Sequence, residues 1–172
     1  MAMADASPRS RDFLTRLSRL TGAEATLLAE AMLVLAFGSA AIRLLPFARV
    51  GKLASGPLGR RRPRQVDELA AKVAWAVRAC ARRAPWRAVC FQQGLASQIM
   101  LRRRGVDSTL YFGAAMGAES ALAAHVWVKA GPTEVVGCDE ADGFAVLATY
   151  PAAPGCESNT IAGRQRFDPI QP

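Results

Sequence analysis

The stretch Cys90-Phe91-Gln92-Gln93-Gly94-Leu95-Ala96-Ser97-Gln98-Ile99-Met100-Leu101-Arg102-Arg103-Arg104-Gly105 is the starting point for interpreting the chain. Apolar residues recur every four positions, which predicts one buried helix face, and Gly105 is typical of a left-handed cap. Cys90 would then lie in the first helical turn, where the helix dipole favours a thiolate. A thiolate nucleophile also needs a base. The chain has a single histidine, His125, so these two residues are the natural candidates for a catalytic pair.

The sequence after Gly105 changes to β-rich runs separated by turn residues. The residues Gly131-Pro132-Thr133 predict a hairpin between two of these runs. We expect small residues to form a loop over 113–120. The predicted strands are Ser108 to Ala115, Ala123 to Ala130, Glu134 to Cys138 and Phe144 to Tyr150.

The sequence before Cys90 favours helices, predicted at Phe13 to Leu20, Thr21 to Leu45 and Val66 to Arg83. Pro46 is expected to break the second helix, and the glycines and prolines after it predict a long irregular connection. Helices followed by antiparallel strands indicate an α+β fold, namely N-terminal helices and then a small antiparallel sheet. The expected organisation is a flexible N-terminus (1–11), a helical region with a basic linker (12–64), a catalytic core (65–151) and a loose tail (152–172).

Composition limits where such a protein works and what it binds. The most apolar run, Ala31 to Ile42, is about half of the roughly 20 residues that span a bilayer, so we expect a packed core helix and no transmembrane segment. The first ten residues lack the layout of a signal peptide. Four cysteines occur without C-x-x-C spacing and beside only one histidine, so no metal site and no cofactor are expected. These features favour a reduced, cytoplasmic protein.

Net charge of +8 comes from 22 basic against 14 acidic residues, with arginine clusters at 60–64, 78–87 and 102–104. Such clusters favour an anionic partner such as a nucleic acid, a membrane surface or an acidic peptide. About half of them have a simpler explanation, because basic residues in a last turn complement the helix dipole.

His125 begins the segment His125-Val126-Trp127-Val128-Lys129, in which alternation places His125 and Trp127 on one face of a strand. A third group must hold the imidazole in one tautomer, and the next hairpin strand is the natural place for it. Asp139, expected to end that strand, is the first candidate. Glu134, Glu140 and Asp142 are the alternatives. Cys80 lies on a predicted buried stripe, and we interpret it and Cys138 as structural.

A lone histidine on a half-buried strand is more often structural than catalytic. The order of the candidates argues for catalysis: a cysteine at a helix start, then a histidine on the first arm of a hairpin, then an acid on the second. Transglutaminase-like and related papain-like folds use this order.

The sequence resembles the lasso peptide biosynthesis B2 proteins, which are stand-alone, transglutaminase-like leader peptidases, over about residues 12 to 150. The segments that carry the resemblance are Cys90, Leu101-Arg102-Arg103-Arg104-Gly105-Val106, Phe112-Gly113, Ala124-His125-Val126-Trp127-Val128 and, upstream, the helix from Glu24 with Leu45-Pro46-Phe47-Ala48-Arg49. The family more often has His-Ala-Trp, so Val126 is a departure. Its acid commonly stands about a dozen residues past the histidine, where this chain has Gly137, and the hairpin turn is expected to bring Asp139 into register.

The resemblance implies a cysteine peptidase that cuts a ribosomally made precursor between leader and core, with Cys90 as nucleophile, His125 as general base and Asp139 as orienting acid. It also implies three partners: the precursor peptide, a separate winged-helix leader-recognition protein, and a separate lasso cyclase that uses the freed amine.

Two other functions fit the same residues. One is an acyltransferase that uses the Cys-His-Asp triad and delivers the thioester to an amine. The other is a non-enzymatic basic adaptor that binds nucleic acid or membrane through its arginines.

Overall fold

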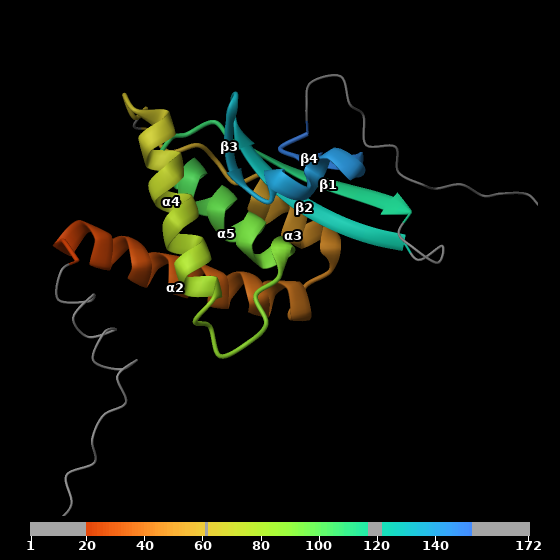
Figure 1. Ribbon diagram of the computed structural model, residues 1–172, viewed down its shortest axis with the longest axis horizontal. Helices are drawn as coiled ribbons and strands as arrows, with labels where there is room; N and C mark the ends of the chain where they lie inside the picture. Colours follow the sequence, from red (N-terminus) through yellow and green to blue (C-terminus); the bar gives the residue numbers. More distant parts are fainter. Residues whose placement is uncertain (1–19, 61, 117–121, 153–172) are drawn as a thin grey trace, which may run out of the picture.

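The computed structural model describes residues 20–60, 62–116 and 122–152. The predicted helix over 13–20 and the expected loose ends of the chain lie outside these residues, apart from Leu20 and Ala152. In chain order (Figure 1) the elements are α2 (Gly22–Leu44), α3 (Phe47–Ala54), α4 (Val66–Ala81), α5 (Cys90–Arg103), β1 (Thr109–Met116), β2 (Leu122–Ala130), β3 (Thr133–Val136), the 3₁₀ helix η2 (Cys138–Gly143) and β4 (Ala145–Tyr150).

The strands form one antiparallel sheet in the order β3-β2-β1-β4. In Figure 1 the helices gather on one side of this sheet, with α5 between the strands and the outer helices. The predicted α+β fold, with helices followed by a small antiparallel sheet, is confirmed.

Helix α2 begins with a capping box, since the hydroxyl of Thr21 accepts from the Glu24 N–H and the Glu24 carboxylate accepts from the Thr21 N–H. One face packs on α4 and α5, and Ala31 and Leu35 are fully buried there, as expected of a packed core helix. Within the described residues α2 alone is long and apolar enough to cross a membrane, a property that core helices share. Its outer face leaves Leu33 exposed.

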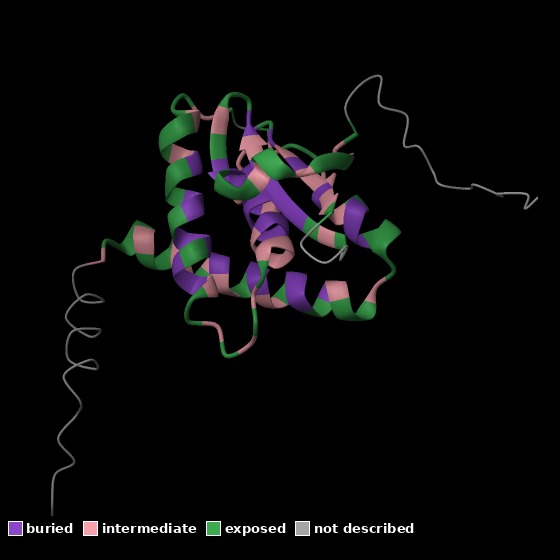
Figure 2. Cartoon of the chain, turned by 45° about the vertical axis from the view of Figure 1, so that its right-hand side comes forward, coloured by how far each residue is buried: buried purple, intermediate pink, exposed green. Residues whose placement is uncertain are grey.

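The hydrophobic core lies between α5 and β2, with the buried faces of α2 and α4 closing it (Figure 2). Leu95 and Met100 of α5 and Val128 of β2 are fully buried. Gly94 permits the close contact of α5 with the sheet, because a Cβ there would lie 2.6 Å from the Val126 Cγ1 atom. The small residues near Cys90 therefore let the strand that carries His125 approach the helix that carries the thiol.

A network of hydrogen bonds ties the C-terminal end of α5 to its surroundings. The buried Arg102 side chain donates to the Gly56 carbonyl (2.6 Å) and more weakly to the Ser108 carbonyl (3.4 Å). The Gly59 N–H donates to the Arg102 carbonyl (2.7 Å), and Arg104 donates to Glu30 of α2 (3.0 Å). These arginines of the 102–104 cluster thus have structural partners within the chain.

Three local predictions are wrong. Residues 47–54 form α3, although they were expected to belong to an irregular connection. Strand β1 continues to Met116, close to the end of the predicted strand at Ala115, so the loop that was also expected from Gly113 does not begin there. Strand β3 ends at Val136 and Asp139 lies in η2, not at a strand end, because Gly137 turns the chain with a φ of 71°.

Candidate active site

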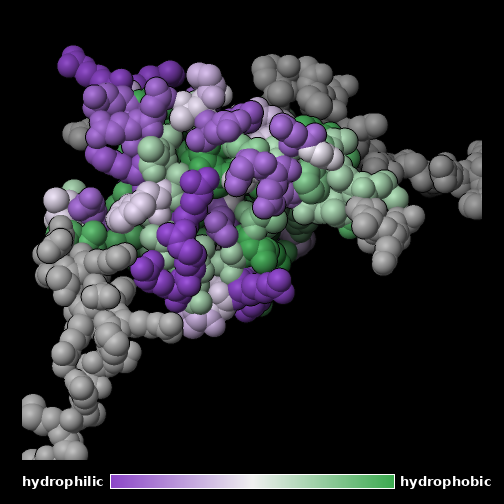
Figure 3. Space-filling view, in the orientation of Figure 1, coloured by the Kyte–Doolittle hydropathy of each residue, from purple (hydrophilic) through white to green (hydrophobic). Residues whose placement is uncertain are grey.

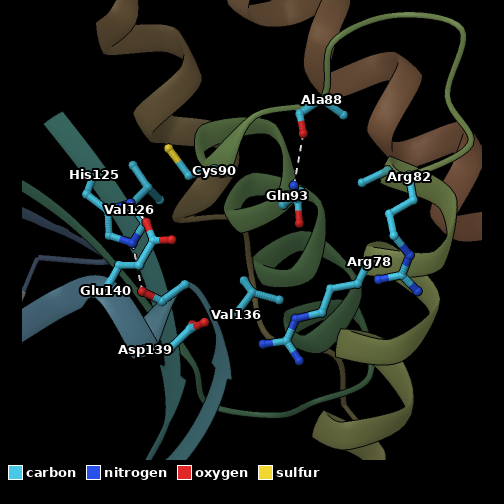
Figure 4. Close-up of a pocket in the computed structure, with 12 residues that line it drawn as sticks. Arg78, Arg82, Ala88, Cys90, Gln93, His125, Val126, Val136, Asp139 and Glu140 are labelled. Carbon is cyan, nitrogen blue, oxygen red and sulfur yellow. Dashed lines mark hydrogen bonds and ion pairs between the residues drawn. The ribbon is translucent and has the colours of Figure 1, made fainter.

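The chain forms an open cleft of about 450 Å³ at the N-terminal end of α5. Figure 4 shows side chains converging on it from three directions: α5, the sheet with η2, and α4. It is lined by Arg78, Ala81, Arg82, Ala88, Cys90, Gln93, His125, Val126, Val136, Gly137, Asp139 and Glu140. The structure therefore places all three predicted site residues, Cys90, His125 and Asp139, around one hollow.

Cys90 is the first residue of α5 and is partly exposed to the cleft. The preceding residue, Val89, is the N-cap and makes no side-chain hydrogen bond to the helix. The first N–H groups of any helix lack partners inside the helix. With no side chain capping them, these donors are left for a ligand near the sulfur.

His125 lies on β2 and is 6% exposed. Its Nε2 atom is 2.7 Å from the carbonyl oxygen of Gly137. A carbonyl can only accept, so Nε2 carries the proton and, in the neutral ring, Nδ1 is the basic nitrogen. Phe144 and Trp127 lie against the ring, with centroids 5.1 Å and 6.1 Å away. The imidazole is thus held in one tautomer and in one orientation.

The position of the Gly137 carbonyl is fixed by its backbone. Gly137 has a left-handed φ of 71°, and a Cβ there would lie 2.5 Å from the Val126 carbonyl oxygen and 3.2 Å from the imidazole Nε2. Both restrictions favour glycine. A backbone oxygen, and not one of the predicted acids, therefore makes the short contact with the histidine at this position.

The predicted acids fall into two groups. Asp139 and Glu140 line the cleft, and the Glu140 carboxylate is 3.9 Å from the His125 Nδ1 atom. In the part of the chain that the structure describes, Asp139 makes no hydrogen bond or ion pair with His125. Glu134 pairs instead with Lys129 at 3.3 Å, and Asp142 is not among the cleft residues.

The other cysteines of the described residues differ from Cys90 in their surroundings. Cys80 and Cys138 are buried, and burial is the main cause that raises the pKa of each thiol. Their sulfurs lie near backbone oxygens, 3.3 Å from Leu28 and 3.4 Å from Val128. These contacts fit the structural role expected for both.

The cleft also contains Gln93, which was not singled out from the sequence, and Arg78 and Arg82, which the sequence placed only in the basic cluster over 78–87. Arg78 donates to the Val135 carbonyl at 3.1 Å and so links α4 to β3. Gln93 donates to the Ala88 carbonyl at 2.9 Å, which fixes the chain just before Cys90. Arg82 also lines the cleft. A helical projection places Arg78 and Arg82 on one face of α4, but only the fold shows that this face meets β3.

No group of three or more metal-ligating side chains occurs among residues 20–60, 62–116 and 122–152.

Comparison with protein families matches residues 31–149 to the transglutaminase-like superfamily. The match covers more than half of the 172 residues, and the chain belongs to this superfamily. Folds of this class commonly carry cysteine-dependent enzymes, which agrees with a thiol and an imidazole in one cleft. No curated protein and no solved structure gave a significant match.

Proposed function

We propose that this protein is a cysteine peptidase that removes the leader from a ribosomally made lasso precursor peptide, before a separate cyclase closes the macrolactam. The observation that carries the proposal is the cleft, which Cys90 at the uncapped start of α5 shares with the tautomer-fixed imidazole of His125. Superfamily membership and the resemblance to lasso B2 proteins support the same reaction.

In the first half of the reaction, the basic Nδ1 atom of His125 takes the thiol proton and the Cys90 sulfur attacks the last leader carbonyl. The negative oxygen of the tetrahedral intermediate is stabilised by N–H groups at the start of α5. Collapse breaks the peptide bond, and the proton on Nδ1 passes to the leaving amine of the core peptide. The leader is left as a thioester on Cys90.

In the second half, a water molecule gives a proton to Nδ1 and attacks the thioester carbonyl. The C–S bond breaks, the proton returns to the sulfur, and the leader leaves with a new carboxylate. The Gly137 carbonyl keeps Nε2–H in place throughout, and the Glu140 carboxylate lies 3.9 Å from Nδ1. Asp139 is the second candidate for orienting His125, because it lines the same cleft.

The protein is proposed to act in the cytoplasm with a separate leader-recognition protein. The exposed residues Arg60 and Arg62 line a hollow of about 580 Å³ with Arg103 and Arg104. Their charge suits an acidic leader segment or the partner.

The test is mass spectrometry of the precursor peptide encoded beside this protein's gene, incubated with the leader-recognition protein and either wild type or Cys90→Ala. We expect cleavage at one bond by wild type and a loss of at least about 10³-fold in the variant. Equal cleavage by both proteins would refute the proposal. A mass gain on an added amine, in place of hydrolysis, would indicate the acyltransferase alternative. Salt-dependent binding of nucleic acid or membranes that survives Cys90→Ala, without cleavage, would indicate the adaptor.

A further inference from the structure

A second hollow of about 520 Å³ adjoins the catalytic cleft between α4 and β3. It shares Arg78, Arg82 and Asp139 with the cleft, so the two form one elongated groove. Figure 3 shows hydrophilic side chains gathered over α4 and over the segment after β3, with more apolar surface between them. A groove that continues from a reactive thiol is a natural path for an extended substrate.

Trp75 lines the second hollow and is 42% exposed. The buried face of α4 is formed by other residues, such as Val73 and Val77, and Trp75 is not part of the hydrophobic core. Trp127 is buried, and Trp86 is packed against the core. Folding therefore accounts for the other two tryptophans of the chain but not for the position of Trp75. A partly exposed tryptophan on a groove wall is the kind of side chain that anchors a bound peptide.

The second hollow does not favour a substrate of one charge, because its lining includes both basic residues, Arg78 and Arg82, and acidic ones, Glu134 and Asp139. The Arg78 guanidinium is already engaged with the Val135 carbonyl. Discrimination between peptides is therefore expected to come from the apolar surface of Trp75.

The spacing sets which substrate residue would reach Trp75. Trp75 lies about two helical turns before Arg82, or roughly 10 Å along α4. An extended peptide advances about 3.3 Å per residue. This stretch of the groove takes about three residues of extended peptide, and the cleft beyond Arg82 adds to that number, so the contact falls at least about three residues from the scissile bond.

We propose that this hollow is a specificity subsite of the peptidase, in which Trp75 binds a large apolar or aromatic side chain of the precursor peptide at least about three residues from the cut. The inference rests on the proposed function, since the substrate is the peptide that Cys90 cleaves. It adds a specificity-determining residue to that site.

The first experiment measures cleavage of the precursor encoded beside this protein's gene by wild type, Trp75→Ala, Trp75→Phe and Phe37→Ala. Phe37 is a matched control, because it is a 53% exposed aromatic residue on α2, away from the groove. We expect Trp75→Ala to raise KM about tenfold with little change in kcat, Trp75→Phe to restore most of the loss, and Phe37→Ala to match wild type. Equal KM for wild type and Trp75→Ala would overturn the inference.

The second experiment replaces each large apolar residue within five positions of the cut in the same precursor by alanine, one at a time. We expect one replacement to raise KM for wild type about as much as Trp75→Ala does, and to add little in the Trp75→Ala enzyme. Fully additive effects at every position would contradict a contact with Trp75.

Binding to Cys90→Ala separates this inference from the proposed function. The precursor should change the tryptophan fluorescence of Cys90→Ala, and the change should be lost in Cys90→Ala with Trp75→Phe. If the fluorescence change occurs but wild type does not cleave the precursor, binding in the groove is supported and the peptidase activity is refuted. If wild type cleaves the precursor and the Trp75 variants bind and cleave it equally well, the peptidase activity is supported and the Trp75 subsite is refuted.

Discussion

The two ends of helix α5 are built in opposite ways. At the C-terminal end, the Arg102 side chain and backbone and Arg104 are tied to neighbouring segments and to Glu30. At the N-terminal end, Val89 supplies no cap, and Cys90 opens onto a cleft. A helix anchored at one end can leave the donors at the other end unpaired, and unpaired donors beside a thiol are what acyl chemistry uses.

The largest difference between the two ends of α5 is expected in stability, when one side chain at each end is replaced by alanine. Arg102→Ala removes a buried side chain and leaves the Gly56 carbonyl without its donor, while the Ser108 carbonyl keeps the Gln98 amide as a donor. This should lower the free energy of unfolding by about 2–4 kcal/mol. Cys90→Ala removes a partly exposed thiol and should change it by less than about 1 kcal/mol. Urea unfolding followed by circular dichroism measures both. Equal losses would show that the ends do not differ in this way.

A smaller loss of stability, which depends on pH, is expected when Glu30 is replaced by glutamine. The hydrogen bond from Arg104 lowers the pKa of this carboxyl, so its contribution to stability is complete above the unfolded pKa of about 4.3 and is lost as the pH falls through the lower folded value. Because the pair is partly solvated, Glu30→Gln should cost about 1 kcal/mol near neutral pH.

The measurement is urea unfolding of wild type and Glu30→Gln between about pH 3 and pH 7. The difference between them should shrink below about pH 4. Glu68→Gln, which removes the exposed Glu68–Lys72 pair, is the control and should cost less than about 0.5 kcal/mol. A Glu30→Gln cost that does not change with pH would contradict the assignment to an ion pair.

The smallest effect, on kcat/KM, is expected from the acidic residues of the cleft at the N-terminal end of α5. Glu140 is 76% exposed, so Glu140→Gln should lower kcat/KM for the precursor only about twofold. Asp139→Asn should have a similar or smaller effect, because Asp139 makes no hydrogen bond or ion pair with His125 in the described residues. A loss of about 100-fold or more in Asp139→Asn would instead assign the orienting role to that carboxylate.

The sequence allowed the fold class, most helix boundaries and the cysteine and histidine of the cleft to be predicted. These depend on local features: the spacing of apolar residues, the turn at Gly131 and the chain order of the candidates. The connection over α3, the loop from Gly113 and the position of Asp139 at a strand end were predicted wrongly, and each error involves a glycine.

Each of these glycines was interpreted as a sign of a loop or passed over, but the fold gives it another use. Gly51 lies within α3, where a Cβ would be 2.5 Å from the Tyr150 ring. Gly113 lies within β1, where a Cβ would be 2.8 Å from the Trp127 ring. Gly137 ends β3 and presents its carbonyl to His125. In all three cases the partner is distant in sequence, so a local pattern could not distinguish a flexible position from a tightly packed one.

The hydrogen bond from His125 to the Gly137 carbonyl also affects how mutagenesis of this site should be designed. Side-chain substitution does not remove a backbone oxygen, and substitution of Gly137 itself would disturb the backbone that presents it. An alanine scan would therefore test the proposed roles of Cys90 and His125 but would overlook any contribution of the Gly137 carbonyl. Replacing the amide between Gly137 and Cys138 with an ester by semisynthesis weakens the carbonyl as an acceptor while keeping every side chain, so backbone chemistry is the tool that can measure its contribution.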